Sequence, residues 1–136
     1  WAAAIIGVCA GCGCYFAVQL KNRMRWDDAM DVWGVHGMGG VIGTILLGVF
    51  ASNAINPGMV DPAGNPVFGL ALGGGGAFLL KQIIAVLGAS LYAFIFTYLM
   101  LFLINLVTRV RVSEEEELAG LDKSQHEESA YDKGAL

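Results

Sequence analysis

The sequence predicts an all-α protein, a polytopic membrane bundle of helices. Of its 136 residues, 56% are hydrophobic and only 15% are charged, whereas about 25% of residues are charged in an ordinary soluble domain. Three uncharged runs are each long enough to cross a bilayer, which takes about 20 residues in a helix. So few charges cannot cover the outside of a soluble domain. We therefore expect three transmembrane helices, at about residues 1–20, 32–54 and 79–108.

The charges divide the chain into two parts. Residues 1–112 carry six basic and four acidic side chains, whereas residues 113–136 carry two basic and eight acidic ones. We expect the first part to lie in the membrane and the second to form an acidic, water-soluble tail. The sequence has no basic patch with interleaved aromatic residues, so it predicts no nucleic-acid partner.

Basic clusters follow the first and third predicted spans, at residues 21–25 and 109–111. With three crossings, both clusters lie on the same side of the membrane. Because basic loops are typically cytoplasmic, we expect a cytoplasmic C-terminus and an outward-facing segment at residues 52–77. The glycine tract within residues 62–80 indicates a loop rather than a helix.

The predicted spans differ in character. The first and second contain small-residue pairs, Gly7 with Gly11 and Gly39 with Gly43, which allow helix backbones to approach closely. The third has large apolar side chains on every side, which indicates contact with lipid. Its uncharged run would be about 40 Å long as one helix, which exceeds the hydrocarbon core of about 30 Å. Because the chain opens at Trp1 without an initiating Met, we interpret it as the C-terminal piece of a longer protein.

His36 is the main candidate for chemistry, because it lies inside the second predicted span. Ionisable groups at such a depth usually face the interior of the bundle or a water path. A neutral imidazole offers one donor and one acceptor nitrogen. At about 100° per residue, His36 shares a helix face with Val32, Gly40 and Gly43, as the wall of a narrow conduit would. The alternative is a buried histidine that hydrogen-bonds to a neighbouring helix.

Three aspartates, Asp27, Asp28 and Asp31, precede His36. The pattern of Asp28 and Asp31 is typical of a helix N-cap followed by an acid in the first turn, where the helix dipole favours negative charge. Asp31 lies about 140° around the helix from His36 and is therefore a candidate for helix packing, holding a partner helix in register.

Three cysteines, Cys9, Cys12 and Cys14, have a spacing that suggests a metal site. Zinc takes four ligands, and no second cluster in the sequence completes the set, so we interpret the cysteines as small packing residues. We predict no metal and no cofactor. The sequence also lacks a nucleophile–base pair and a phosphate-binding loop, and it therefore predicts no enzyme.

The acidic tail carries two local patterns. Residues 114–117 are four consecutive glutamates, which usually form a solvated face. Residues 122–125 fit a capping box beginning at Asp122, which would start a short helical turn.

Two segments of the chain resemble the Amt–Mep–Rh family of ammonium transporters. Residues 27–40 are similar to the tenth transmembrane helix of that family, and residues 109–131 are similar to its C-terminal tail. The glycine tract Gly73–Gly76 followed by Gln82 is similar to the start of the eleventh helix. The resemblance covers essentially the whole chain and implies helices nine to eleven of an eleven-helix protomer.

The resemblance implies transmembrane transport of ammonium or ammonia through a hydrophobic pore lined by two facing histidines. His36 matches the second histidine of that pair, and Val32 would line the pore towards the cytoplasm. Members of the family are homotrimers in the plasma or inner membrane, with one conduction path in each protomer.

The resemblance also implies a regulatory tail, which packs across protomers and, in many prokaryotic members, lies where a PII-type signalling protein docks. It carries this role over to Gly120, Asp122 and Tyr131. The chain departs from the family at one position, because Glu127 stands where the family often has glycine. We expect the side chain and its negative charge to alter the turn of the tail.

The alternative function is a non-conducting ammonium sensor or a membrane interaction module. Sensor relatives usually append a signalling domain after the eleventh helix, whereas only 24 residues follow the membrane part here.

Overall fold

The structure is a computed structural model that describes residues 1–130. Within these residues the regular elements are helices, and pairing between extended segments is limited to two isolated bridges, Ser52 with Phe68 and Val60 with Pro66. The prediction of an all-α fold is confirmed.

Three helical segments of the described chain are long and apolar enough to cross a membrane. Helix α1 covers Ala2–Met24, the π-helical turn η1 (Trp33–Gly37) continues directly into α2 (Met38–Phe50), and α3 covers Gly76–Asn105. This arrangement agrees with a polytopic helical bundle. The chain divides into two compact units between Leu91 and Tyr92, inside α3.

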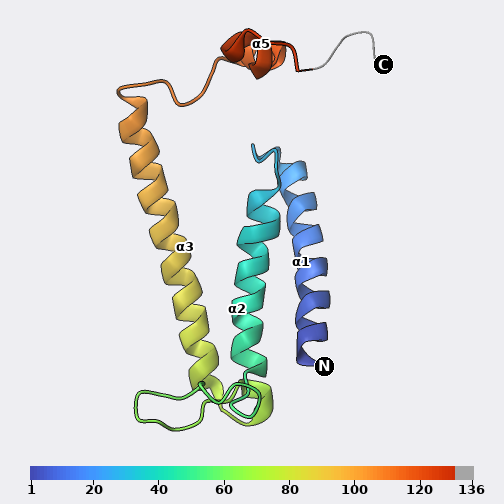
Figure 1. The fold of residues 1–136 in the computed structure, drawn as a ribbon, viewed down its shortest axis with the longest axis vertical. Coiled ribbons are helices and arrows are strands. Elements are labelled where there is room, and N and C mark those ends of the chain that lie inside the picture. The colour runs from blue at the N-terminus through green and yellow to red at the C-terminus, as the bar shows by residue number, and fades with distance from the viewer. Residues whose placement is uncertain (131–136) are drawn as a thin grey trace. The chain divides into compact units, whose positions relative to one another are not determined.

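Helices α1 and α2 lie side by side in the first unit (Figure 1). Glycines permit the close approach: a Cβ atom at Gly34 would lie 2.7 Å from Val18 Cγ2, and one at Gly39 would lie 3.2 Å from Cys14 Sγ. Gly13 is similarly crowded by Ile42. Helix packing in this unit therefore depends on glycines that no side chain could replace without a shift.

Of the four glycines that the sequence analysis pairs for close helix packing, one lies at the contact between α1 and α2. Gly39 lies against Cys14, but a Cβ atom at Gly7, Gly11 or Gly43 would have no neighbour within 4 Å among the described residues. A packing role for those three glycines stays a prediction.

The loop between α2 and α3 is held by local hydrogen bonds. The Gly69 amide donates to the Ala51 carbonyl at 2.7 Å, and the Gly74 amide donates to the Gly69 carbonyl at 3.1 Å. The Asn53 side chain donates to the carbonyls of Pro57 and Met59. A short 3₁₀ turn, η2 (Leu70–Leu72), precedes the glycine tract. The segment is thus a folded loop rather than a loose tether.

The predicted limits of this loop need correction. The third predicted span begins at about residue 79, but α3 begins at Gly76, so residues 76–78 are helix and not loop. The left-handed backbone that breaks the helix lies earlier, at Gly73 (φ 84°) and Gly75 (φ 66°), and the residues that follow are good helix formers. Likewise, α2 ends at Phe50, four residues before the predicted limit at Ala54, because the Ala51 backbone leaves the helical region (ψ 139°).

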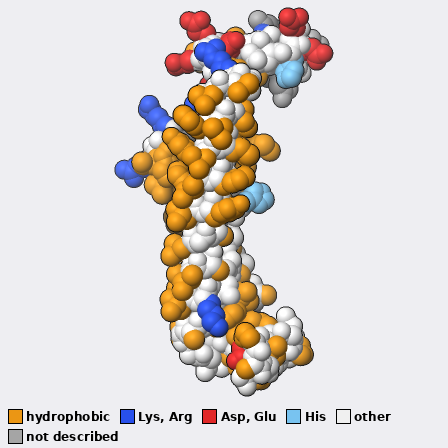
Figure 2. All heavy atoms as spheres, turned by 90° about the vertical axis from the view of Figure 1, so that its left-hand side faces the viewer, with side chains coloured by type: hydrophobic (Ala, Val, Ile, Leu, Met, Phe, Trp, Pro, Cys, Tyr) orange, Lys and Arg blue, Asp and Glu red, His pale blue; other side chains and the backbone are white. Residues whose placement is uncertain are grey.

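Helix α3 has no buried residue among those described. Figure 2 shows hydrophobic side chains covering the surface of the long helices, and acidic side chains gathered on the short helices of the C-terminal segment. At about 1.5 Å per residue, the 30 residues of α3 span about 45 Å, which is more than the hydrocarbon core needs.

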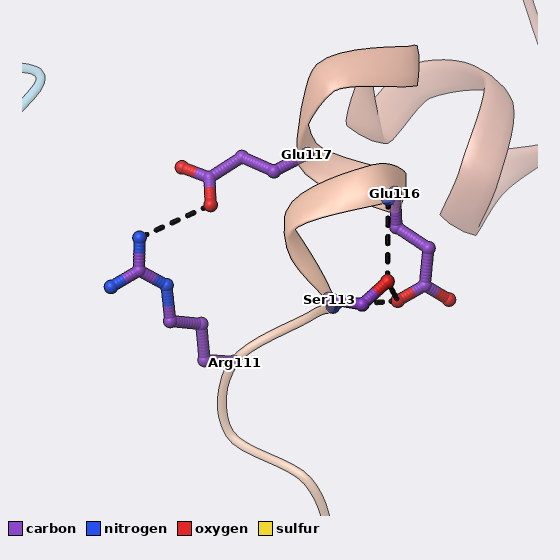
Figure 3. Close-up of polar contacts among 4 residues, drawn as sticks. All are labelled: Arg111, Ser113, Glu116 and Glu117. Atoms are coloured by element: carbon purple, nitrogen blue, oxygen red, sulfur yellow. Dashed lines mark hydrogen bonds and ion pairs between the residues drawn. The ribbon is translucent and has the colours of Figure 1, made fainter.

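Two short helices form the described part of the tail, α4 (Glu114–Ala119) and α5 (Leu121–His126). Figure 3 shows how α4 begins: the Ser113 hydroxyl accepts from the Glu116 amide, and the Glu116 carboxylate accepts from the Ser113 amide at 2.7 Å. The same figure shows Arg111 Nη2 bound to Glu117 Oε2 at 3.1 Å. This reciprocal capping satisfies two donors at the start of the helix.

The predicted capping box at Asp122 is wrong. Asp122 lies inside α5, and the residue that precedes this helix is Gly120, which has no side chain to act as a cap. The Asp122 carboxylate instead accepts from the Ala130 amide at 3.0 Å. The pattern was misleading because α5 already begins at Leu121, which places Asp122 second in the helix and not before it.

Candidate functional site

His36 lies in the π-helical turn η1, not in a regular α-helix. The Met38 amide donates to the Trp33 carbonyl, five residues back, which fits one more residue into the turn than an α-helix would. The His36 side chain is exposed on the described structure. Such turns are rare and occur frequently at functional sites, and His36 is one of the five residues of this turn.

The wider turn changes which residues share a face with His36. The prediction that Val32, His36, Gly40 and Gly43 align assumed 3.6 residues per turn, and that periodicity does not hold between Trp33 and Gly37. Val32 precedes the π turn and is itself 51% exposed. The predicted alignment of these four residues on one helix face therefore does not follow from regular α-helical geometry.

Asp28 caps the start of this helix. Its carboxylate accepts from the Val32 amide and from the Trp33 amide, both at 2.9 Å. These donors have no partner inside the helix, so the carboxylate both satisfies them and places negative charge at the positive end of the dipole. Asp28 thus binds amides at the helix start, but from four and five residues earlier; the residue at the N-cap position is Val32, so the predicted N-cap position of Asp28 is wrong.

Asp31 does not lie in the first helical turn, so that part of the prediction is wrong. Its φ of 55° is left-handed, a conformation that aspartate adopts more readily than most residues. The Asp31 carboxylate pairs with Lys21 Nζ at 2.5 Å, and its carbonyl accepts from the Val35 amide at 2.8 Å. Asp31 therefore joins the end of α1 to the π turn.

Lys21 is the residue that sequence reasoning missed. It was read only as one of a cluster of basic residues, yet it is 6% exposed, whereas Arg23 and Arg25 are exposed. Its Nζ also donates to the Asp28 carbonyl at 2.6 Å. The sequence signal was its place as the first charge after an apolar run, ten residues before Asp31.

The cysteines lie on α1 near this region. Cys14 Sγ donates to the Val35 carbonyl at 3.4 Å, while Cys9 and Cys12 are exposed. Over residues 1–130, no group of three His, Cys, Asp or Glu side chains is arranged to hold a metal ion.

The tail residues form a second candidate region. Gly120 links α4 to α5 with φ 96°, a conformation that L side chains rarely adopt. The amide of Ala130, bonded to Asp122, holds the pKa of that carboxyl below its ordinary value of 3.8. Glu127 ends α5 at φ 56°, where glycine would carry no strain. Tyr131, the third predicted tail residue, lies outside the described residues.

Comparison with protein families decides the class. Residues 1–131 match the family model described as the Ammonium Transporter Family. The chain belongs to the ammonium transporter family. The resemblance predicted from the residues is thereby confirmed at the level of the family, which is a family of transporters and not of enzymes.

Individual ammonium transporters show the same similarity. The chain is 42% identical over 131 residues to an ammonium transporter of Aquifex aeolicus, covering 94% of this chain and 27% of the relative. It is 37% identical over 129 residues to ammonium transporter Amt1 of Archaeoglobus fulgidus, covering 95% and 30%. With an ammonium transporter of Bacillus subtilis it shares 36% identity over 132 residues, covering 96% and 31%. The chain thus spans less than a third of the length of these curated relatives.

Proposed function

We propose that this chain forms the C-terminal three helices, nine to eleven, of a protein that transports ammonium or ammonia across the plasma or inner membrane. Two observations support the proposal. Residues 1–131 match the ammonium transporter family, and residues 1–130 include three helices able to cross a membrane. In this proposal residues 1–112 are the membrane part, residues 113–136 are the tail, and the tail is cytoplasmic, as the basic clusters favour.

His36 is proposed to line the conduction path, with Val32 beside it towards the cytoplasm. The main support is that the His36 imidazole is exposed and lies at a π turn, within a helical segment long and apolar enough to cross a membrane. Desolvating an ammonium ion is costly, whereas neutral ammonia crosses an apolar path far more easily. A neutral imidazole accepts a hydrogen bond from a substrate N–H at one nitrogen and donates from the other. It therefore replaces part of the water that the substrate leaves behind.

We further propose a homotrimer with one path per protomer, the second histidine of each path lying outside this chain. Asp31, Gly39 and Gly43 serve helix packing. Gly120, Asp122 and Tyr131 belong to a regulatory tail that couples protomers and offers a docking face to a PII-type signalling protein. The Gly120 turn and the bond from the Ala130 amide to Asp122 support an ordered structure over residues 113–130 of the tail rather than a merely solvating role.

The test is ammonium-evoked current, together with ammonia flux, in proteoliposomes that hold the full-length protein. His36→Ala should abolish the current or change its ion selectivity. His126→Ala is the matched control, because it removes the other histidine, at the end of α5, and should leave the current unchanged. An unchanged current in His36→Ala would remove His36 from the path. Absence of both current and ammonia flux in the unmodified protein would refute transport and leave the sensor alternative.

A further inference from the structure

A buried lysine lies next to the segment that carries His36. Among the residues described, Lys21 is the buried charged side chain, 6% exposed, in the last turns of α1. Removing an ammonium group from water is unfavourable unless the charge is paired and hydrogen-bonded. Lys21 meets both conditions through the Asp31 carboxylate, at 2.5 Å, and the Asp28 carbonyl, at 2.6 Å.

The two partners of Lys21 are the residues that fix the start of the second span. Asp28 binds the Val32 and Trp33 amides, and the Asp31 carbonyl accepts from the Val35 amide. Trp26 packs edge-on against Trp33, with ring centroids 5.1 Å apart. A single ammonium group on α1 thus anchors the connector from which η1 begins.

The anchor bears on the π turn itself. A π turn holds one more residue than an α-turn, and such turns are rare. If the connector is released, the Met38 amide can bond four residues back, to Gly34, in place of Trp33. That change expels the extra residue and rotates His36 about the helix axis. The bonds of Asp28 and Asp31 to the amides of Val32, Trp33 and Val35 oppose such a shift.

We propose that Lys21 is a positioning residue for His36: its bonds to Asp31 and Asp28 hold the π turn in register and so aim the imidazole. The inference rests on the proposed function of His36 in the conduction path. Lys21 is not needed merely to join the helices, because Gly34 against Val18 and Cys14 bonded to Val35 already pack η1 onto α1. Its loss should therefore move the turn without unfolding the pair.

The test uses Lys21→Met in the full-length protein in proteoliposomes. Arg23→Met is the matched control, since it removes the same charge from the same end of α1 but at an exposed position. The first measurement is hydrogen–deuterium exchange of the peptide covering residues 32–38. Lys21→Met should speed its exchange about tenfold, the effect typical of losing a hydrogen bond to a charged group, and Arg23→Met should not.

The second measurement is the transport rate of methylammonium relative to ammonium. A rotated imidazole changes this ratio, whereas a general loss of folded protein lowers both rates equally. Lys21→Arg, which keeps a cation at this position, should show the same ratio of methylammonium to ammonium transport as the unmodified protein. In Asp31→Asn the buried ammonium loses its counter-charge, and combining this change with Lys21→Met should be no worse than either change alone, because both act through one pair.

Three results would overturn the proposal. One is that Lys21→Met and Arg23→Met show the same hydrogen–deuterium exchange over residues 32–38 and the same ratio of methylammonium to ammonium transport. Another is faster exchange that extends to residues 13–20 of α1, which would make Lys21 a general packing residue. The third is additive effects of Lys21→Met and Asp31→Asn. If the unmodified protein transports neither substrate, the proposed function fails by itself, while the exchange measurement still decides whether Lys21 holds the turn.

Discussion

Two glycines in the π turn should respond oppositely to the same substitution. Gly34 is buried, and a methyl group there would lie 2.7 Å from Val18 Cγ2 and 3.2 Å from the Val18 amide nitrogen. At Gly37, the nearest atom to such a methyl group would be Trp33 Cδ1, at 3.5 Å. Neither glycine has a positive φ, so alanine fits both backbones.

The distances set the size of the effect. Carbon atoms in contact lie about 3.5–4.0 Å apart, so the methyl group at Gly34 is about 0.8 Å too close to a side chain and also crowds backbone that cannot rotate away. Overpacking of this kind costs about 1–3 kcal/mol. Replacing a helical glycine recovers about 0.5–1 kcal/mol of chain entropy at either position. Because this recovery is common to both, Gly34→Ala should be about 2 kcal/mol less stable than Gly37→Ala.

The assay is unfolding of the purified full-length protein in mixed micelles with an increasing fraction of sodium dodecyl sulfate. Gly37→Ala should unfold at the same or a higher fraction than the unmodified protein, and Gly34→Ala at a lower one. Equal stability of the two variants would refute the reasoning, since it would mean that η1 and α1 do not meet at Gly34 and Val18.

Two further predictions concern the tail. Glu127→Gly should stabilise α5 by about 1 kcal/mol, because the left-handed backbone of Glu127 penalises an L side chain. Amides of α5 should then exchange about fivefold more slowly. Glu127→Ala removes the carboxylate but keeps the Cβ atom that causes the penalty, so it should give no gain. The pKa of Asp122 is lowered mainly by the Ala130 amide. The stability that this hydrogen bond contributes is therefore complete above the ordinary pKa of an aspartate and is lost as the pH falls through the lowered pKa of Asp122. The protection factor of the Ala130 amide against hydrogen exchange should accordingly fall in acid. In the control Asp122→Asn, which cannot titrate, it should not depend on pH. A pH-independent protection factor in the unmodified protein would contradict the prediction.

Composition was enough to predict the three long helices and to single out His36 as a candidate, whereas α4 was not predicted. Apolar runs that long have few alternatives to membrane-spanning helices, and His36 stands out because an ionisable group is so rare at that depth. The predicted limits were less accurate, because helix ends depend on single backbone conformations. Ala51 and Gly75 decide where α2 ends and α3 begins, and the neighbouring residues have similar composition.

The π turn and the role of Lys21 lay beyond the sequence for a different reason. A helical wheel assumes a constant period, so it cannot reveal an extra residue in one turn. Lys21 resembles Arg23 and Arg25 in type and place, and only the fold of the connector distinguishes the buried cation from the exposed ones. Both features arise from contacts between segments, which local propensity does not encode.

The loop between α2 and α3 has a consequence for biosynthesis. Its closing bond joins Gly69 to Ala51, and both residues leave the ribosome before α3, which begins at Gly76. Hairpin-sized closures take about 1–10 μs, whereas adding the 30 residues of α3 takes seconds at about 5–20 residues per second. The loop can therefore close first, so that the last long helix elongates from an anchored end instead of searching for its place after release.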